Sequence, residues 1–417
     1  MIVRRLEVGL AGGALLVAAL STGYSFLFYL VYLAAVVVGG SYVLTRLGLA
    51  DLEAGYALNR LYGHVGERLQ VTYTVRQASR LPKPWLAVHN PTDLPGGLAG
   101  RAIALGPRGE RSWLVRLPLT RRGHFRIEPL VIRTGDPFGF FEASATVGHP
   151  VSVTVYPRIE RLPFWRLPAA NIEGSHATPV RTLQTTPLAT TVRPWAPGDG
   201  FNRIHWKTTA RQGEIQVKEF DLEQTADVWI FLDLEGAIQA GQGDDSTAEV
   251  AVRVAASVAD RAIAENRAVG LTVSGHRTTI LPADRGGRQH LKIMHLLAAV
   301  EADGSSPLAE TLISTLSRLR RGMTAVIITP SVEPEWARLL STLRPRGIGC
   351  VVVALDGQSF DLRARARERS AAARGGDEPD AQAAAGRLRA LRHALAEYGI
   401  KVHVVAAGQP LAEALAG

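Results

Sequence analysis

The sequence predicts a chain of class α/β plus all-β that begins with a transmembrane helical hairpin. Three features predict this: an uncharged N-terminal stretch, a region whose apolar residues alternate with period two, and a region of apolar runs between helical patterns. The 417 residues allow two or three domains. We expect a hairpin at 1–46, an antiparallel β-sandwich at 58–160, a connector at 161–226 and a doubly wound α/β domain at 227–417.

The uncharged stretch runs for 38 residues, from Val8 to Thr45. A single helix of that length would be about 57 Å long, against a hydrocarbon core of about 30 Å, so two spans fit better. The turn falls at 21–23. Arginines bracket the stretch, at Arg4, Arg5 and Arg46. The positive-inside rule then predicts a two-span anchor in the cell membrane with the soluble domains in the cytoplasm. A secretory signal peptide is the alternative.

Period-two alternation follows an expected linker at 47–57. Leu69, Val71, Tyr73 and Val75 alternate with polar residues, which is typical of a half-buried strand. Short apolar segments between Pro- and Gly-containing turns predict further strands at 85–89, 111–117, 124–133 and 151–156. Together they predict a compact sandwich of about 100 residues.

Continuous apolar runs in the last domain predict buried parallel strands, at 228–232, 269–274, 325–329 and 348–355. Helical patterns lie between or after them, at 247–266, 288–301, 307–320, 334–343 and 388–398. The ligand edge of such a sheet lies at the carboxyl ends of its strands, one of which is Asp233. The Arg- and Ala-rich stretch at 363–374 lacks aromatic residues, so we expect a solvated insertion there and no nucleic-acid partner.

Composition and missing motifs restrict the function. The net charge of +9 suits nucleic acid, an anionic membrane surface or an acidic protein partner, and composition alone does not choose among them. The one cysteine, Cys350, suits a reducing compartment. The sequence has no phosphate-binding loop, zinc-protease motif, nucleophile elbow or dinucleotide fingerprint. We therefore predict that the protein is not an enzyme.

One segment, 193–220, is unusually dense in charged and aromatic residues. It contains a turn carboxylate followed by a short basic helix, expected over 202–211. We weigh three interpretations: a clamp of ion pairs with Ile204 and Trp206 buried, a docking surface for an acidic partner, and a catalytic pair of Asp199 and His205. The residues of this signature segment that we single out are Arg193, Gly198, Asp199, Arg203, His205, Trp206, Lys207, Arg211, Lys218 and Glu219.

The signature segment resembles that of the bacterial family called domain of unknown function 58. Upstream landmarks at 120–123, 136–139 and 155–158 are also similar to that family. The resemblance implies a membrane anchor, a β-sandwich and a C-terminal domain similar to the von Willebrand factor type A fold. It also implies partners, namely MoxR-type AAA+ ATPases and other membrane proteins similar to transglutaminases.

Domains of the type A kind often bind Mg²⁺ through Asp-x-Ser-x-Ser after the first strand. Here that motif reads Asp233-Leu234-Glu235-Gly236-Ala237, so both serines are missing. Asp233 and Glu235 are weak candidate ligands, and a strand-end cap is the alternative role of Asp233. We expect no cofactor, with Mg²⁺ as the alternative.

The sequence as a whole predicts a membrane-anchored scaffold that faces the cytoplasm and binds proteins, among them a MoxR-type AAA+ ATPase. The first alternative is a divalent-metal-dependent ligand-binding module that uses Asp233. The second is a hydrolase that uses Asp199 and His205.

Overall fold

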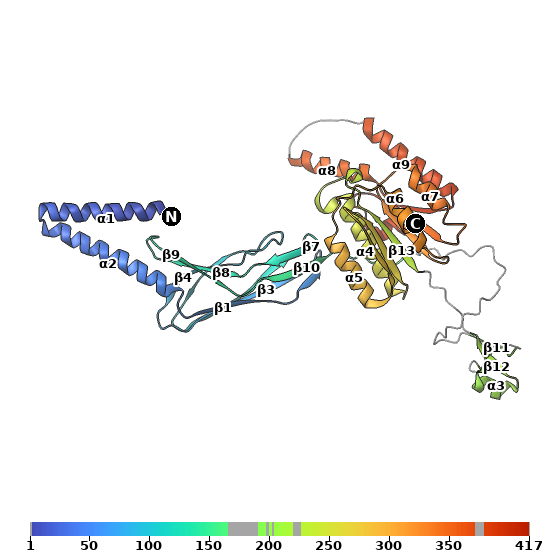
Figure 1. Cartoon of the computed structure of the whole chain (residues 1–417), viewed down its shortest axis with the longest axis horizontal. Helices are drawn as coiled ribbons and strands as arrows, with labels where there is room; N and C mark the ends of the chain where they lie inside the picture. The colour runs from blue at the N-terminus through green and yellow to red at the C-terminus, as the bar shows by residue number, and fades with distance from the viewer. Residues whose placement is uncertain are drawn as a thin grey trace. The chain divides into compact units, whose positions relative to one another are not determined.

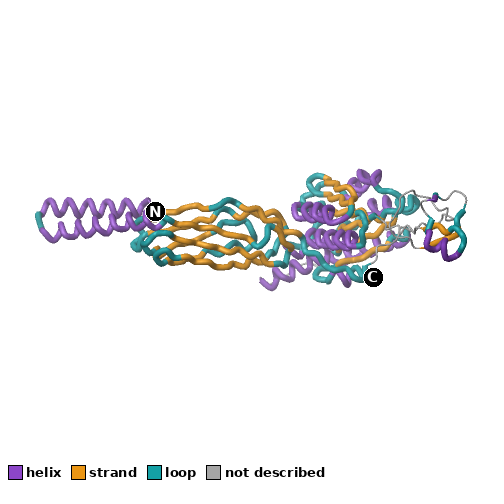
Figure 2. Tube along the Cα trace, turned by 90° about the horizontal axis from the view of Figure 1, so that it is seen from below, coloured by secondary structure: helices purple, strands orange, loops and turns teal. Residues whose placement is uncertain are grey.

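The computed structural model describes residues 2–165, 191–196, 200–201, 204–219, 227–371 and 379–416. In these residues helices and strands are mixed, as Figures 1 and 2 show. The chain forms two compact units. The first comprises Met1–Arg158 with Met294–Val300, and the second comprises Ile159–Ile293 with Glu301–Gly417.

The first unit starts with two helices, α1 (Ile2–Thr22) and α2 (Ser25–Gly48), which lie side by side. The chain turns between them at Gly23, whose φ of 65° is in the left-handed region that favours glycine. α2 has 24 residues and is long and apolar enough to cross a membrane. The apolar part of α1 is shorter, at Leu10–Thr22. Of the two expected spans, only the second reaches the usual length.

Ten strands follow in three sheets. In sheet order, their bounds are β1 (Leu52–Leu58), β3 (Arg68–Gln77) and β6 (Glu110–Pro118); β2 (Tyr62–His64), β10 (Val151–Tyr156) and β7 (Gly123–Ile127); β5 (Arg101–Leu105), β4 (Lys83–His89), β8 (Leu130–Gly135) and β9 (Glu142–Val147). Neighbouring strands are antiparallel except for β2 and β10, which are parallel.

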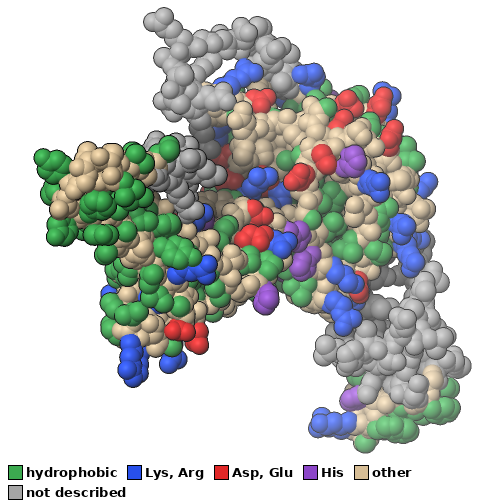
Figure 3. All heavy atoms as spheres, turned by 60° about the vertical axis from the view of Figure 1, so that its left-hand side comes forward, with side chains coloured by type: hydrophobic (Ala, Val, Ile, Leu, Met, Phe, Trp, Pro, Cys, Tyr) green, Lys and Arg blue, Asp and Glu red, His purple; other side chains and the backbone are tan. Residues whose placement is uncertain are grey.

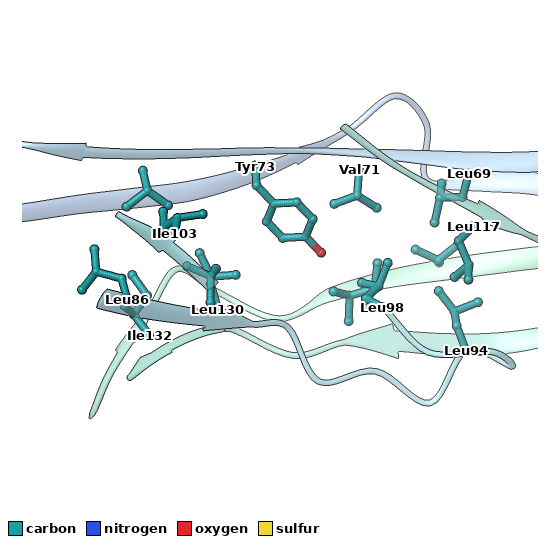
Figure 4. Close-up of a cluster of buried hydrophobic side chains, with 14 of the residues drawn as sticks. Leu69, Val71, Tyr73, Leu86, Leu94, Leu98, Ile103, Leu117, Leu130 and Ile132 are labelled. Carbon is teal, nitrogen blue, oxygen red and sulfur yellow. The ribbon is translucent and has the colours of Figure 1, made fainter. Parts of the chain in front are cut away.

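A single apolar core joins these sheets. Alternate residues of β3 are buried, as the period-two pattern predicts, and Tyr73 points into the core that it shares with Leu86 of β4 and Leu130 of β8 (Figure 4). The Tyr73 hydroxyl donates to the side-chain oxygen of Asn90 at 3.1 Å, so this buried polar atom keeps a hydrogen bond.

Two expectations for this region were wrong. The linker expected at 47–57 contains most of β1, which pairs with β3 along seven residues. The strand expected at 124–133 is two strands, β7 and β8, in different sheets. Pro129 lies between them and has no N–H to donate to a ladder, which explains the break.

The second unit contains a six-stranded sheet of order β15-β14-β13-β16-β17-β18. The strands are β13 (Val228–Asp233), β14 (Val269–Ser274), β15 (Thr278–Asp284), β16 (Thr324–Thr329), β17 (Gly349–Leu355) and β18 (Lys401–Val405). All neighbours are parallel except β14 and β15, which are antiparallel. The four predicted apolar runs are therefore confirmed as adjacent central strands.

Helices cover the sheet on both faces (Figure 1). Trp229 and Phe231 of β13 pack in one cluster with α6 (Leu308–Thr315), α7 (Pro334–Ser341) and α9 (Pro379–Glu397). α4 (Thr247–Ala264) lies against β13, β14 and β16 with its apolar side buried. The chain also forms α5 (Gly286–Ala299) and α10 (Leu411–Ala414).

The stretch at 363–374, expected as a solvated insertion, is helical in part. Residues Gly357–Ala371 form a helix, α8, in which the Arg363 guanidinium pairs with Asp245 at 3.4 Å. Ala and Arg are strong helix formers, and this propensity outweighed the lack of an apolar stripe. Residues 372–378 lie outside the described part of the chain.

The connector expected at 161–226 contains structure at both ends. Before it, Glu160 pairs with Arg253 of α4 at 3.5 Å, and its N–H donates to the Ser257 hydroxyl at 2.9 Å. Trp165 is buried. Near its end, β11 (Thr191–Pro194), α3 (Trp206–Gln212) and β12 (Gln216–Glu219) form a small module. Residues 166–190 lie outside the description.

The end of α2 is joined to the strands by a buried lysine. Lys83 of β4 is 3% exposed, and its ammonium donates to the carbonyl oxygens of Leu47, Gly48 and Ala50 at 3.0, 3.0 and 2.7 Å. A helix leaves its last carbonyl groups without partners four residues on. The Leu47 carbonyl also accepts the N–H of Ala50 at 3.2 Å, and Lys83 supplies a charged donor to all three carbonyl groups. Gly48 also lies so close to β8 that a Cβ there would be 2.7 Å from Cγ2 of Thr134. We call this contact the α2 junction.

Replacing the capping lysine should loosen the α2 junction. Lys83→Ala leaves three partly buried carbonyl groups without their charged donor, and we expect a local loss of about 1–3 kcal/mol. Hydrogen exchange of peptides from α2 and β8, measured on the full chain in nanodiscs, reports this loss. Arg80→Ala, an exposed neighbour, should leave the exchange unchanged. Equal exchange in the two variants would contradict the capping role.

Candidate functional site

The order of the six-stranded sheet defines a switch point between β13 and β16. From β13 the chain continues to β14 on one side and returns through β16 on the other. Ligands of open α/β sheets bind outside the carboxyl ends of the strands at such a point. Asp233 ends β13, and Thr329 ends β16 on the neighbouring strand. The sequence therefore placed the candidate Asp233 at the correct edge.

Asp233 is fully buried, and three protein groups occupy its carboxylate. The Thr329 hydroxyl donates to Oδ2 at 2.6 Å. The Ser274 hydroxyl and the Glu235 N–H donate to Oδ1 at 3.1 and 3.3 Å. The carboxylate thus connects the ends of β13, β14 and β16, which is the strand-end role considered from the sequence.

Two further carboxylates influence this site. Burial raises the pKa of Asp233, and the nearby charge of Glu333 raises it further, although the hydroxyl and N–H donors oppose the shift. Glu235 is partly exposed, and burial followed by the charges of Asp233 and Glu333 raises its pKa. Burial and mutual repulsion therefore disfavour the charged forms of both carboxylates.

The arrangement does not fit a type A magnesium site. Hydroxyls of Thr329 and Ser274 bond directly to Asp233, so both carboxylate oxygens already have donors. Among the described residues, no group of three or more His, Cys, Asp or Glu side chains is placed to hold a metal ion.

The signature segment folds around a two-stranded hairpin of β11 and β12 (Figure 1). His205 precedes α3, and its Nδ1 accepts the N–H of Thr208 at 3.2 Å, as an N-cap does. The Thr208 hydroxyl lies 2.6 Å from the same nitrogen. The N–H of His205 donates to the carbonyl of Gln216 at 2.7 Å, which ties α3 to β12. His205 therefore has a structural role, because it begins α3 and bonds to β12.

The clamp interpretation of the signature segment predicted that two apolar side chains are buried, and only one of them is. Ile204 is buried at 4% exposure, but Trp206 is 67% exposed, so the expectation that both are buried was wrong. The helix starts at Trp206 rather than at residue 202, because His205 caps it there. Lys207 and Arg211 are exposed four residues apart on α3 and share one side of it.

Not all of the candidate residues can be placed. Gly198, Asp199 and Arg203 lie outside the described residues, and for Lys218 and Glu219 only the backbone in β12 is described. The Arg193 side chain in β11 donates to the carbonyl of Pro194 at 3.0 Å. The structure therefore brings together His205, Trp206, Lys207 and Arg211, and leaves the pairing of His205 with Asp199 untested.

Sequence reasoning missed several residues of both sites. Phe201 and Ile215 are 76% and 44% exposed beside the predicted signature residues. Ser274 and Thr329 end the predicted strands 269–274 and 325–329, but the sequence did not identify them as the hydroxyl donors to Asp233. The available signal was that each ends an apolar run neighbouring β13, since carboxyl ends of parallel strands meet at one edge.

Residues 191–357 match the profile of the family described as "Protein of unknown function DUF58". A relative from Bacillus subtilis (strain 168), described as "Uncharacterized protein YeaD", is 27% identical over 294 residues, which cover 68% of this chain and 70% of the relative. The family match includes the signature segment and the first five strands of the six-stranded sheet, as far as β17. These matches agree with the resemblance of the signature segment to the DUF58 family.

Similarity to solved structures is weak. The CARDB domain of a Pyrococcus furiosus protein in complex with di-metal ions matches with a TM-score of 0.20 at 15% identity, covering 25% of this chain and 92% of that one. The C-terminal domain of wzt matches with a TM-score of 0.21 at 10% identity, covering 26% and 75%. Scores this low carry no argument about fold or function.

Neutralising Asp233 should relieve a buried charge. Because the folded-state pKa lies above the ordinary 3.8, the wild-type chain loses stability as pH rises from 3.8 to that raised value, and then stays constant. Asp233→Asn lacks this loss, so its advantage in hydrogen-exchange protection of β13 and β16 should grow with pH over that window.

The same experiment tests the metal alternative. We expect added Mg²⁺ to leave the exchange of both proteins unchanged, because both carboxylate oxygens of Asp233 already accept hydrogen bonds from protein donors. Protection of the wild-type chain by Mg²⁺ that disappears in Asp233→Asn would contradict this account and favour the divalent-metal module.

Proposed function

We propose that this protein is a membrane-anchored scaffold, facing the cytoplasm, that binds a protein partner through its signature segment. Its work is contact rather than turnover. The observation that carries the proposal is the exposed aromatic and cationic surface of the β11-α3-β12 module. The partner implied by the family resemblance is a MoxR-type AAA+ ATPase.

The exposed surface has the composition of a protein-binding site. Its apolar members are Trp195, Phe201, Trp206 and Ile215, which are 38–76% exposed. Trp195 and Ile215 are neighbours, since the N–H of Trp195 donates to the carbonyl of Ile215 at 2.8 Å. Tryptophan and arginine are enriched among residues that dominate binding energies at interfaces. We call these four residues with Lys207 and Arg211 the docking surface.

The charge of the docking surface favours an acidic partner. Figure 3 shows apolar side chains next to Lys and Arg at the outer end of this module. Lys207 and Arg211 are both exposed and share one side of α3, whereas Glu214 is the only acidic residue whose side chain is described between Arg193 and Val217. A partner that combines carboxylates with an apolar patch would bury the tryptophans and pair the cations.

The anchor in this proposal is a two-span hairpin. It is supported by the length of α2, by the neighbouring α1 and by Arg46 in the last turn of α2, which the positive-inside rule assigns to the cytoplasmic side. We also interpret the ten-stranded region as a β-sandwich, because its sheets share one core. The six-stranded order with one antiparallel edge strand supports a type A fold.

The hydrolase alternative has less support. The Nδ1 atom of His205 caps α3, and Asp199, its expected partner, lies outside the described residues. Catalysis requires a base that reaches a nucleophile or a water molecule. The hydroxyl described beside this ring is that of Thr208, at 2.6 Å from Nδ1, and the same nitrogen also accepts the Thr208 N–H that begins the helix. The scaffold proposal therefore accounts for His205 by its hydrogen bonds alone.

A binding measurement tests the proposal. The full chain in nanodiscs is presented to a purified MoxR-type AAA+ ATPase, and the dissociation constant is determined. Trp206→Ala should weaken binding by about 30-fold, the equivalent of about 2 kcal/mol, and Lys207→Glu with Arg211→Glu by about tenfold or more.

Matched variants control for unspecific effects. Phe164→Ala removes another exposed aromatic ring, at 72% exposure, and Arg338→Glu reverses an exposed charge on α7, so both should bind as the wild-type chain does. Binding that is equally weak in the control variants, or unaffected in the docking-surface variants, would contradict the proposal.

A further inference from the structure

The loop between β8 and β9 is built around one buried carboxylate. Asp136 is 8% exposed, and its side chain accepts the N–H groups of Phe138 at 2.9 Å and of Phe141 at 2.6 Å. The N–H of Gly139 closes the turn on the carbonyl of Asp136 at 3.2 Å, with φ of 75° at Gly139. Burial raises the pKa of Asp136, but these backbone donors outweigh it and the net pKa is lowered. The Asp136 carboxylate therefore fixes the conformation of the loop through its hydrogen bonds to backbone N–H groups.

This fixed loop presents an aromatic tip. The ring of Phe138 is 55% exposed and stacks on Phe140, with centroids 5.7 Å apart and planes inclined by 19°. Stacking keeps the exposed ring in one position instead of letting it fold onto the strands. An aromatic ring held outward in this way points to an apolar partner, since exposing it to water forgoes the free energy of burial.

The same loop packs on the last turns of α2. The ring of Phe141 meets Tyr42 edge to face at 5.6 Å, and the guanidinium carbon of Arg46 lies 5.7 Å from the centre of the Tyr42 ring. Ser41 and Thr45 are 2% and 5% exposed, whereas most apolar side chains of α2 are exposed. One face of α2 is therefore covered by protein as far as Ser41.

The contact with Tyr42 sets the depth of the loop. A span of about 30 Å takes about 20 residues at 1.5 Å each, so one that starts at Ser25 ends at Leu44. Tyr42 then lies just inside the edge of the hydrocarbon, and Arg46 lies among the head groups. Because Phe141 contacts Tyr42, the loop is at the level where the bilayer meets water.

We propose that the tip of the β8–β9 loop, Phe138 with Phe140, inserts into the membrane interface beside α2, so that the strand-rich region is held at a fixed angle to the bilayer. The partner is the lipid surface itself. Aromatic rings favour the interface between bilayer and water. The exposed Arg46 close by suits anionic head groups. The inference rests on the membrane anchor of the proposed function and goes beyond it by assigning a second, separate membrane contact.

Depth-dependent quenching tests the insertion. Phe138→Cys in a Cys350→Ala background is labelled with an environment-sensitive fluorophore, and the full chain is reconstituted in nanodiscs of mixed neutral and anionic lipid. Lipids that carry spin labels at the head group, or at shallow and deep acyl positions, then quench the dye. Two control labels use the same background: Val36→Cys within α2, 71% exposed, and Leu114→Cys on β6, 44% exposed.

We expect shallow labels to quench position 138 several-fold more strongly than position 114, as for a group about 5–10 Å into the interface. Position 36 should be quenched best by deep labels. If position 36 is quenched but position 138 behaves as position 114 does, the insertion is wrong and the anchor stands. A protein-bound tip would give that same result.

Lack of quenching at position 36 would overturn the anchor itself, and the insertion with it. Pro137→Cys, at the exposed neighbouring position, repeats the measurement should the Phe138 variant unfold. Its expected quenching matches that of position 138, and absence of quenching at both positions would count against the insertion.

Discussion

A helix that ends against protein must find donors for its last carbonyl groups, and the first unit depends on how α2 meets this constraint. Lys83 supplies three hydrogen bonds to that helix end from a buried position. The close approach of Gly48 to Thr134 adds a steric limit to the same joint. The joint transmits the orientation of α2 to the strands, because neither contact tolerates much rotation.

The two candidate sites differ in what they leave accessible. Asp233 lies at the edge where α/β sheets bind ligands, but its oxygens are occupied by Thr329, Ser274 and the backbone. The docking surface has the opposite character, because Trp206 and Phe201 remain mostly exposed next to cations. Binding energy at protein interfaces comes from burying such residues. The physical contrast between a closed carboxylate and an open aromatic surface is the reason to favour scaffolding over ion-dependent binding.

The sequence was most informative where one local pattern determines the outcome. The absence of charge predicted α2, and continuous apolar runs predicted the buried strands of the second unit, such as β13 and β16. The position of Asp233 followed from the parallel direction of those strands. Short strands such as β5 and β9 were not predicted, since an alternating pattern over five or six residues is too short to be recognised.

Other features depend on contacts between distant residues and could not be predicted. Whether Trp206 is buried depends on what covers it, and local spacing contains no such information. The two hydroxyl donors to Asp233 lie 41 and 96 residues away in the sequence. The capping role of Lys83 could not be predicted either. A lysine in a strand is ordinarily solvated, and nothing near it in the sequence indicates the helix end that it caps. Because polar groups pair over long sequence distances, the site was harder to predict from the sequence than the fold.

The central claim is that the exposed module of the signature segment is bound by another protein at the membrane. Site-specific photo-crosslinking tests it most directly: a photoreactive amino acid is placed at position 206, or at position 114 as a reference, in the full chain within intact membranes. The account predicts a discrete crosslinked product at position 206 only, containing a MoxR-type AAA+ ATPase. Crosslinks only to lipid, or the same products from both positions, would contradict it.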